Sequence, residues 1–343
     1  VLGCWLLLEA LGSGLLGRLA DRWGRKPSSF AALQVLFALF LPLSLYAAYT
    51  SRFLVGALPG EGIGLVPIFG ASFLILAPVA LVDGAMFAFG ARSYAHLTGA
   101  RAPSISRVYV LEALGGLMGG LVFTFLLIPF LHALQIVLVL VALNLLAAVL
   151  IMAASGLSSG AARAATAGLV ILLLANVGLL LWPGTERAER WAAAQQWPGY
   201  DLVFSENSVY GNVAVVERES QYTFYADGIP ILTAPVPDLA AVEEIVHLPL
   251  LFVPQPRRAL VLSGGVGGVL RELEKYTLAR IDYAELDPLL IEAVQQFPTP
   301  LTTRELGDPR LAIEYVDGRL LVRQKQEAAF PGEKYDLVIV NLP

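Results

Sequence analysis

Charged side chains are scarce in this sequence, and its first half has very few of them. Only 15% of the 343 residues are charged, whereas 57% are hydrophobic. Few charges occur between Phe53 and Leu181, but from Glu186 onward the composition is that of an ordinary globular protein. The sequence therefore predicts two parts, one suited to lipid and the other to water.

Cysteine, histidine and basic runs are also rare. The single cysteine, Cys4, excludes an intrachain disulfide and a thiolate metal site. The three histidines, His96, His132 and His247, lie in unlike segments and show no metal-ligand spacing. The net charge of −5 and the lack of a long basic run give no support to nucleic-acid binding. We expect neither a metal nor a nucleic-acid partner.

The two ends of the sequence resemble interior segments. The chain starts at Val1 within an apolar run, without methionine, and ends at Pro343 directly after a strand-like run. We therefore expect a piece of a longer protein, with material missing on both sides.

Six apolar segments are long enough to cross a bilayer, for which about 20 residues are needed. Lipid offers the backbone no hydrogen-bond partners, so these segments must be helices. Residues 1–182 thus predict a multi-pass transmembrane bundle of about six helices, in contact with the lipid of a cell membrane. The six segments are 1–17, 29–49, 65–90, 108–131, 133–154 and 165–182.

Three acids fall within or at the edge of these segments: Glu9, Asp83 and Glu112. Acids in a membrane are costly and often mark a ligand site or pathway, although pairing near the interface also explains them. The fourth segment also carries four glycines that predict close packing against a neighbouring helix, namely Gly115, Gly116, Gly119 and Gly120.

The loop after the first segment resembles the Asp-Arg, Gly-Arg-Lys loop of major facilitator transporters. The resemblance covers ten residues, from Gly17 to Lys26, and a tight basic turn is the alternative explanation. Basic residues cluster after segments one, three and five, which predicts that those loops are cytoplasmic. Strict alternation then places the water-soluble part outside, whereas one segment that fails to cross would place it inside. The sequence leaves both orientations open.

The water-soluble part begins with a linker over 183–202. A small antiparallel β unit follows over 203–235, where residues 212–217 and 222–225 alternate as strands and Asp227-Gly228 forms a turn. Residues 238–252 predict a helix. From 236 to 343 the pattern of strands and helices is that of a Rossmann-like α/β domain, which lacks its C-terminal part.

A glycine-rich loop joins the first strand of this domain, 259–262, to a helix that begins near Val269. Glycines allow a backbone to approach a ligand closely, and a helix N-terminus offers free N–H groups. We therefore assign ligand contacts to Ser263, Gly264, Gly265 and Gly267.

Polar residues follow the next three strands. Glu285 ends the second strand about 21 residues after Gly264, a distance at which an acid reaches ribose hydroxyls. Asp317 and Gly318 follow the third strand, and Asn341 follows the fourth. The carboxyl ends of parallel strands share one edge, where open α/β sheets bind ligands. The pattern predicts a nucleoside site.

The order of motifs over 203–343 resembles the spermidine synthase (polyamine aminopropyltransferase) family in its membrane-fused bacterial form. The matching segments are Glu206 to Gly211, Asp227-Gly228, Val246 to Leu250, the glycine loop with Val269 to Glu272, Ala284 to Asp287, Asp308 to Arg310, Asp317-Gly318 and Tyr335 to Ile339.

This resemblance implies a transferase of the S-adenosylmethionine-dependent fold. The co-substrate would be decarboxylated S-adenosylmethionine or S-adenosylmethionine, and the acceptor an amine. Glu285 would bind ribose, Asp317 the adenine amino group, and Asp287 would belong to the same site. The catalytic positions of the family are occupied here by Tyr210, Glu243 and Asn341. No metal is expected in the site. The resemblance leaves open whether the chain forms a homodimer.

The amine side departs from the family pattern. Asn341 stands where the family has the aspartate that activates the attacking amine, and an amide cannot take up a proton. Polycations need carboxylates that offset their desolvation, so we expect weak binding of polyamines and slow chemistry. Other polar residues of the family are also replaced here, by Gly211, Ile231, Ala241, Val242 and Val266.

Three functions follow from these observations. The first is aminopropyl transfer, or a related transfer, to an altered amine acceptor in polyamine metabolism. The second is a non-catalytic ligand-sensing domain fused to half of a major-facilitator-like transporter. The third is S-adenosylmethionine-dependent methyl transfer.

Overall fold

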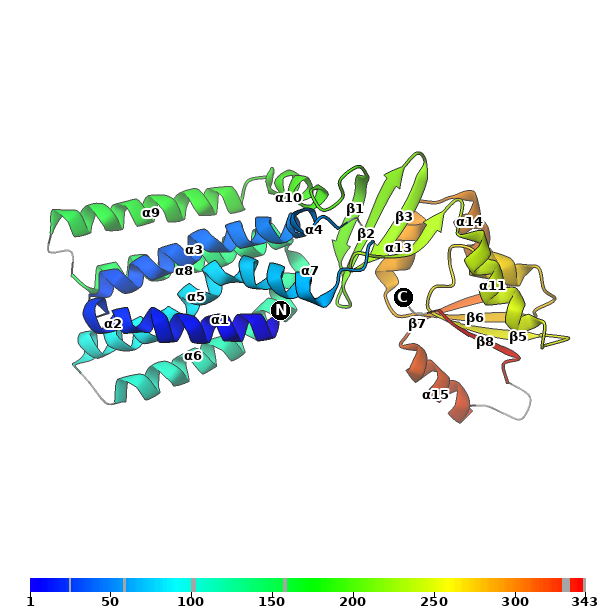
Figure 1. Ribbon diagram of the computed structural model, residues 1–343, viewed down its shortest axis with the longest axis horizontal. Helices are drawn as coiled ribbons and strands as arrows, with labels where there is room; N and C mark the ends of the chain where they lie inside the picture. Colours follow the sequence, from blue (N-terminus) through cyan, green and yellow to red (C-terminus); the bar gives the residue numbers. More distant parts are fainter. Residues whose placement is uncertain (25, 58–59, 100–102, 157–158, 329–333, 342–343) are drawn as a thin grey trace. The chain divides into compact units, whose positions relative to one another are not determined.

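The computed structural model describes residues 1–343 except 25, 58–59, 100–102, 157–158, 329–333 and 342–343. Its elements form two compact units (Figure 1). The helical unit comprises 1–58 and 63–196, and the α/β unit comprises 59–62 and 197–343. Arg25, which belongs to the transporter-like loop, lies outside the described residues.

Among its described residues, the helical unit contains six helical stretches that are long and apolar enough to cross a membrane. Each predicted segment overlaps one of them, so the prediction of six apolar helices is confirmed, while membrane insertion remains a prediction. The stretches are Leu2–Trp23, Pro27–Tyr49, Leu65–His96, Ser106–Phe130, Ala133–Ala154 and Gly160–Leu180. The helices are α1 (Leu2–Leu15), α2 (Gly17–Trp23), α3 (Pro27–Tyr49), α4 (Ser51–Val55), α5 (Leu65–Thr98), α6 (Pro103–Val122), the π-helix η1 (Phe123–Leu127), α7 (Ile128–Phe130), α8 (Ala133–Ala154), α9 (Gly160–Leu180) and α10 (Thr185–Ala194).

Helices α1 and α5 approach each other closely. A Cβ atom at Gly12 would overlap the backbone of Leu81, and one at Gly84 would overlap the backbone of Glu9. The glycines of α6 behave differently, because a Cβ at Gly115, Gly116, Gly119 or Gly120 meets nothing within 4 Å. The prediction of close packing at these α6 glycines is therefore wrong within the described part of the chain.

Helix α10 occupies half of the stretch for which the sequence predicts a linker, 183–202. Glu189 on α10 accepts hydrogen bonds from the Tyr49 hydroxyl and, at 3.1 Å, from the backbone N–H of Leu134. Trp191 stacks on Tyr46, with ring centroids 6.3 Å apart. These contacts fix α10 to α3 and to the start of α8, so the stretch is partly folded onto the helical unit.

The α/β unit opens with a four-stranded antiparallel sheet in the order β1-β2-β3-β4. Asp227 and Gly228 both have positive φ angles, as the tight turn between β3 and β4 requires. The strands fall where the alternation of the sequence predicts them. They are β1 (Asp201–Asn207), β2 (Asn212–Arg218), β3 (Gln221–Ala226) and β4 (Ile229–Ala234).

The second sheet has four parallel strands in the order β7-β6-β5-β8. This is the Rossmann-like α/β architecture that the sequence predicts. The elements are α11 (Leu239–Leu250), β5 (Arg258–Leu262), α12 (Val269–Glu274), β6 (Arg280–Glu285), α13 (Pro288–Gln296), α14 (Pro300–Leu306), β7 (Leu311–Tyr315), α15 (Gly318–Ala328) and β8 (Leu337–Val340).

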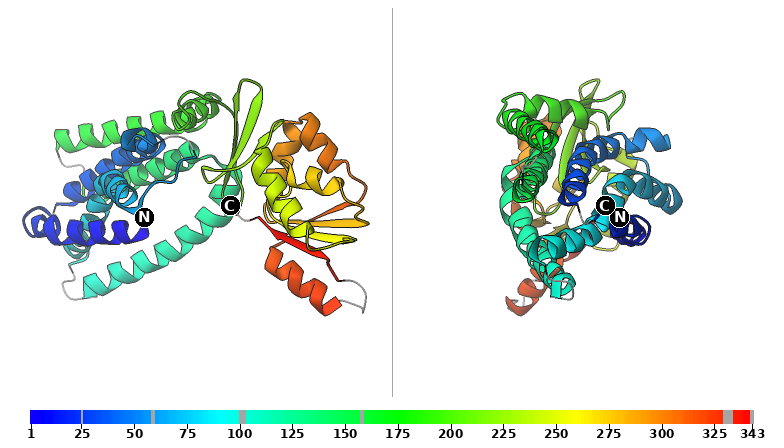
Figure 2. Two further views of the ribbon diagram at one scale, coloured as in Figure 1. Left: turned by 45° about the vertical axis from the view of Figure 1, so that its right-hand side comes forward. Right: turned by 90° about the vertical axis from the view of Figure 1, so that its left-hand side faces the viewer.

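Helices cover both faces of the parallel sheet. Helix α15 lies on one face, where Leu321 packs against Leu260 and Ala284 (Figure 2). The other face packs against α11 to α14 and the antiparallel sheet in one continuous core, to which Val215, Phe224, Val261, Ile281 and Val294 belong. Because both sheets share this core, the β unit is held firmly beside the parallel sheet.

The close approach of the glycine loop to β4 leads to a stability prediction. A Cβ at Gly267, where φ is +97°, would lie 2.7 Å from the Cβ of Leu232. Gly199 also has a positive φ, +82°, but a Cβ there meets nothing within 4 Å. Gly199→Ala should cost about 1 kcal/mol through backbone strain alone, and Gly267→Ala about 1–3 kcal/mol more through overpacking.

This difference is measured by urea unfolding of the full chain in detergent, with hydrogen exchange in β2 and β5 as the readout. Equal losses of stability in the two variants would contradict the packing of the loop against β4.

Candidate functional site

The loop between β5 and α12 turns sharply because four of its six residues are left-handed. Ser263, Gly264, Gly267 and Gly268 have φ angles of +60°, +58°, +97° and +122°. The N–H of Ser263 donates to the carbonyl of Ala284 at 2.9 Å, which ties the loop to the end of β6. Ser263 and Gly264 are half-buried, and the rest of the loop is buried.

The buried glycines of this loop accommodate neighbouring parts of the protein. A Cβ at Gly265 would lie 3.0 Å from the ring of Tyr283, and one at Gly268 would lie 2.9 Å from Val242. Gly267 meets Leu232, as described above. The accessible backbone of the loop is therefore Ser263 and Gly264, whereas Gly265 and Gly267 serve the packing of the domain.

The N–H groups at the start of α12 are already bonded within the chain. Glu305 on α14 accepts from Gly267 at 2.9 Å, from Gly268 at 2.7 Å and from Arg271 at 3.1 Å. The expectation of free N–H groups at this helix N-terminus is therefore wrong for Gly267, Gly268 and Arg271. Nothing in the sequence pattern around Glu305 indicates this role, because the residue is close to the loop only in space.

Glu285 is held rigidly at the carboxyl end of β6. The side chain is buried, Oε1 accepts from the backbone N–H of Leu286 at 3.0 Å, and Oε2 accepts from the hydroxyl of Tyr283. Burial raises the pKa of Glu285, against the hydrogen bonds from Tyr283 and the backbone, which lower it. The carboxylate is thus fixed in orientation by these two hydrogen bonds.

Asp317 lies just after the neighbouring strand, β7. The N–H of Val316 donates to the carbonyl of Glu285 at 3.1 Å, so the ends of β6 and β7 are joined at the predicted site. Asp317 accepts from the side chain and the N–H of Arg319, and these bonds lower its pKa to about 2. A Cβ at Gly318 would lie 3.2 Å from Leu262, so this glycine allows α15 to start close to β5.

Asp287 and Asn341 complete the polar edge. Asp287 caps α13 through the N–H of Leu289 at 3.0 Å and accepts from the hydroxyl of Ser208 at 2.7 Å, which links the β unit to the parallel sheet. Asn341 donates through Nδ2 to the carbonyl of Gly264 at 2.9 Å. The family's amine-activating position therefore lies next to the accessible part of the loop.

Tyr210 and Glu243 lie on other elements. Tyr210 is exposed in the turn between β1 and β2. Glu243 is exposed on α11, where its carboxylate, His247 and Glu272 each offer an atom within 4.8 Å of the others. The catalytic role of each residue remains a prediction.

The cluster around His247 is an internal hydrogen-bond network. His247 Nδ1 lies 2.7 Å from the Tyr276 hydroxyl and Nε2 lies 2.8 Å from Glu272, so both ring nitrogens are engaged. Lys275 also pairs with Glu272. Burial would raise the pKa of Glu272, but the hydrogen bonds from Lys275 and His247 lower it. A cation would have to displace these partners.

An open parallel sheet with a fixed acid at its carboxyl edge defines a nucleoside-binding type of α/β domain. A family model for the spermine/spermidine synthase domain matches residues 239–343. The C-terminal part of the chain is therefore similar to the spermine/spermidine synthase domain, in line with the motif order.

Similar proteins carry three related names. Polyamine aminopropyltransferase of Clostridium perfringens strain SM101 is 31% identical over 143 residues, which are 41% of this chain and 48% of that protein. Spermidine synthase 2 of Hyoscyamus niger is 35% identical over 155 residues, 42% of this chain and 48% of its own length. Putrescine N-methyltransferase 2 of Nicotiana tabacum is 30% identical over 165 residues, which are 47% of this chain and 42% of that protein.

Two solved structures show the same extent of similarity. The spermidine synthase of Thermotoga maritima is 27% identical, with 41% of this chain and 47% of that chain covered at a TM-score of 0.36. A spermidine synthase in complex with the transition-state analogue AdoDATO gives the same values. The chain thus spans less than half the length of the relatives described here.

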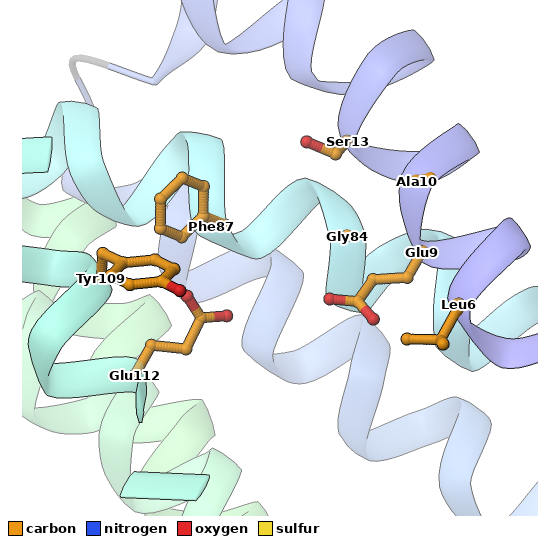
Figure 3. Close-up of a pocket in the computed structure, with 8 residues that line it drawn as sticks. All are labelled: Leu6, Glu9, Ala10, Ser13, Gly84, Phe87, Tyr109 and Glu112. Carbon is orange, nitrogen blue, oxygen red and sulfur yellow. The ribbon is translucent and has the colours of Figure 1, made fainter. Parts of the chain in front are cut away.

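A separate hollow of about 340 Å³ lies in the helical unit, between α1, α5 and α6. Figure 3 shows the carboxylates of Glu9 and Glu112 directed toward one another across it. The rings of Phe87 and Tyr109 lie on the Glu112 side (Figure 3). Two of the three predicted intramembrane acids therefore share one space.

The fixed position of Glu285 predicts that its replacement will weaken nucleoside binding without destabilising the fold. Glu285→Gln keeps the size of the side chain but weakens its bonds to ribose hydroxyls, so affinity for 5′-methylthioadenosine should fall by about 1–3 kcal/mol in calorimetry. The matched control is Glu314→Gln on β7, whose carboxylate pairs with Lys325 at 2.7 Å. Equal affinity in the Glu285 variant and the wild type would remove Glu285 from the site.

The raised pKa of Glu285 predicts that Glu285→Gln, which lowers affinity, does not lower the stability of the fold. A raised pKa in the folded state means that the group stabilises the fold at pH values below its unfolded pKa and that this contribution is lost as pH rises through the folded pKa. Glu285→Gln removes that loss, so the variant should match or exceed the wild type in urea unfolding at neutral pH. Lower stability at neutral pH would contradict this assignment.

Proposed function

We propose that this chain is a membrane-bound transferase of the spermidine synthase type. Its α/β unit would bind decarboxylated S-adenosylmethionine, or S-adenosylmethionine, and transfer an aminopropyl or related group to an amine. The observation that carries the proposal is the buried carboxylate of Glu285, held at the edge of the sheet beside the accessible backbone of Ser263 and Gly264. The domain match over 239–343 and the names of the relatives support it.

On the nucleoside side, Glu285 would accept hydrogen bonds from both ribose hydroxyls. Asp317 lies after the adjacent strand and would accept from the adenine amino group. Its low pKa keeps it ionised at neutral pH. Ser263 and Gly264 would contact the ligand through their backbone, and Asp287 would act by holding the β unit against the site.

The reaction is a displacement at carbon. The lone pair of the acceptor amine attacks the aminopropyl carbon attached to the sulfonium, a C–N bond forms, the C–S bond breaks and methylthioadenosine leaves. The amine must also give up a proton. Asn341, next to Gly264, can orient the amine through its side-chain oxygen but cannot accept that proton, so we expect slow transfer to ordinary polyamines.

The acceptor side supports a less cationic amine. Val266 and Val242, which replace polar family positions, are buried in the hydrophobic core. Ile231 packs against the same core. These positions therefore offer no charge to offset the desolvation of a second ammonium group, which favours an acceptor with a single cationic centre.

The helical unit supports a multi-pass location in a bacterial cell membrane. Its six apolar stretches have the length and composition of membrane spans. Surface labelling of cysteines introduced at exposed positions such as Val209 would assign the side of the α/β unit, for which the basic loops favour the exterior and the supply of nucleoside favours the cytoplasm.

A direct assay tests the transfer. The full chain in detergent is incubated with decarboxylated S-adenosylmethionine and a panel of mono- and diamines, and methylthioadenosine release is measured. A parallel reaction uses S-adenosylmethionine with a labelled methyl group, because one relative is named for N-methyl transfer. Methylthioadenosine release supports aminopropyl transfer, labelled amine favours methyl transfer, and binding without either product would sink the enzyme hypothesis for these acceptors.

Asn341→Asp should raise the rate of aminopropyl transfer, because a carboxylate can accept the amine proton. The structure adds a cost: the variant loses the 2.9 Å hydrogen bond from Nδ2 to the Gly264 carbonyl and places two acceptors together, about 1–3 kcal/mol of stability. Initial rates across a pH series, with unfolding measured in parallel, separate the two effects. No gain in rate at any pH, with the fold retained, would contradict the assignment of this position.

A second candidate function, cation transport or sensing by the helical unit, is favoured by the Glu9–Glu112 hollow. Facing carboxylates in an apolar setting are stabilised by a bound cation. Uptake of labelled putrescine into proteoliposomes, compared between wild type and Glu9→Gln, tests this candidate. Uptake that is lost in the variant would support transport, and no uptake by the wild type would exclude it for that amine.

A further inference from the structure

Helix α10 is attached to the ends of three apolar helices of the helical unit (Figure 1). It begins at Thr185, shortly after α9 ends at Leu180. Glu189 accepts hydrogen bonds from Tyr49, the last residue of α3, and from the N–H of Leu134, in the first turn of α8. A bilayer crossed by α3, α8 and α9 therefore has α10 at the level of its surface.

Aromatic side chains gather at this level and remain exposed. Trp182 and Trp191 are 56% and 61% exposed, and Tyr46, on which Trp191 stacks, is 45% exposed. Tryptophan and tyrosine are enriched where a membrane meets water, because each ring has an apolar body and a polar group that forms hydrogen bonds. The three rings therefore fit the headgroup level of a bilayer.

The surface of α10 has an apolar flank and a polar flank, as the helical period of about 3.6 residues places them. Ala188, Trp191 and Ala192 lie on the apolar flank, whereas Glu186 and Arg190 lie on the polar flank. At 10 residues, α10 is also too short to cross a bilayer. An amphipathic helix of this kind lies in the plane of a membrane surface.

Two arginines of α10, Arg187 and Arg190, are exposed. Glu189, the acid between them, is engaged by Tyr49 and Leu134. In the described part of the chain, the ion pairs include neither arginine. A guanidinium group can bind a phosphate through two hydrogen bonds, and its long stem lets it reach along a surface. The two arginines therefore suit a layer of phosphate groups.

We propose that α10 is an interfacial helix, which lies in the headgroup layer of a phospholipid bilayer and binds lipid phosphates through Arg187 and Arg190. Trp182, Trp191 and Tyr46 lie at the boundary between the headgroups and the acyl chains. A phospholipid surface is the partner because it supplies an apolar layer and a phosphate layer side by side. This inference rests on the proposed membrane location of the helical unit.

Nitroxide labels on the full chain in phospholipid nanodiscs measure the depth of α10. In a Cys4→Ala background, the label is attached through Ala188→Cys on α10, Leu174→Cys on α9 or Gln295→Cys on α13, all at exposed positions. The ratio of collisions with oxygen to collisions with a nickel chelate rises with depth in lipid. We expect this ratio to be at least about threefold higher at 188 than at 295, and highest at 174.

The three labels separate the failure of this inference from the failure of the membrane location. Equal ratios at 188 and 295, with a high ratio at 174, would overturn the interfacial helix and leave the membrane location supported. A ratio at 174 as low as the ratio at 295 would contradict the membrane location, and this inference with it.

The charge of the lipid tests the two arginines. Nanodiscs of phosphatidylcholine are compared with nanodiscs that also contain phosphatidylglycerol, whose negative charge attracts arginine. The anionic lipid should raise the collision ratio at 188 by about twofold, and Arg187→Gln/Arg190→Gln should abolish this rise. The matched control is Arg257→Gln/Arg323→Gln, which removes two exposed arginines of the α/β unit. An equal rise in the two double variants would overturn the binding of lipid phosphate by α10.

Discussion

The parallel register of β5, β6, β7 and β8 is the constraint on which the candidate site depends. Because the four strands run in one direction, the residues that follow them emerge at one edge of the sheet. Hydrogen bonds then join neighbouring strand ends: Val316 to Glu285, Ser263 to Ala284 and Asn341 to Gly264. A ligand at this edge would meet groups that the backbone has already brought together.

Much of the local structure holds the residues of the candidate site in place. Tyr283 orients Glu285, Ser208 ties the β unit to Asp287, and Glu305 fixes the glycine loop. Burial raises the pKa of Glu285, so that we expect its ionised form to cost stability at neutral pH. Such a cost is typical of a functional group that must be fixed before its partner arrives.

The sequence predicted the features that depend on short-range pattern. The six apolar helices, the alternating strands around Asp227-Gly228, and the four parallel strands with Glu285 and Asp317 at their ends all follow from spacing and composition. It could not predict contacts between distant segments. Glu305 reaches the loop from α14, Leu232 and Val242 fill the space beside the loop glycines, and α10 folds onto α3 where a linker was expected.

The central claim is that a nucleoside binds at the carboxyl edge of β5, β6 and β7. Hydrogen–deuterium exchange of the full chain in detergent, with and without 5′-methylthioadenosine, measures this most directly. The account predicts slower exchange in peptides that contain Leu262 to Gly265, Glu285 to Asp287 and Val316 to Gly318. Unchanged exchange at all three strand ends under saturating nucleoside, or slowing confined to the helical unit, would contradict it.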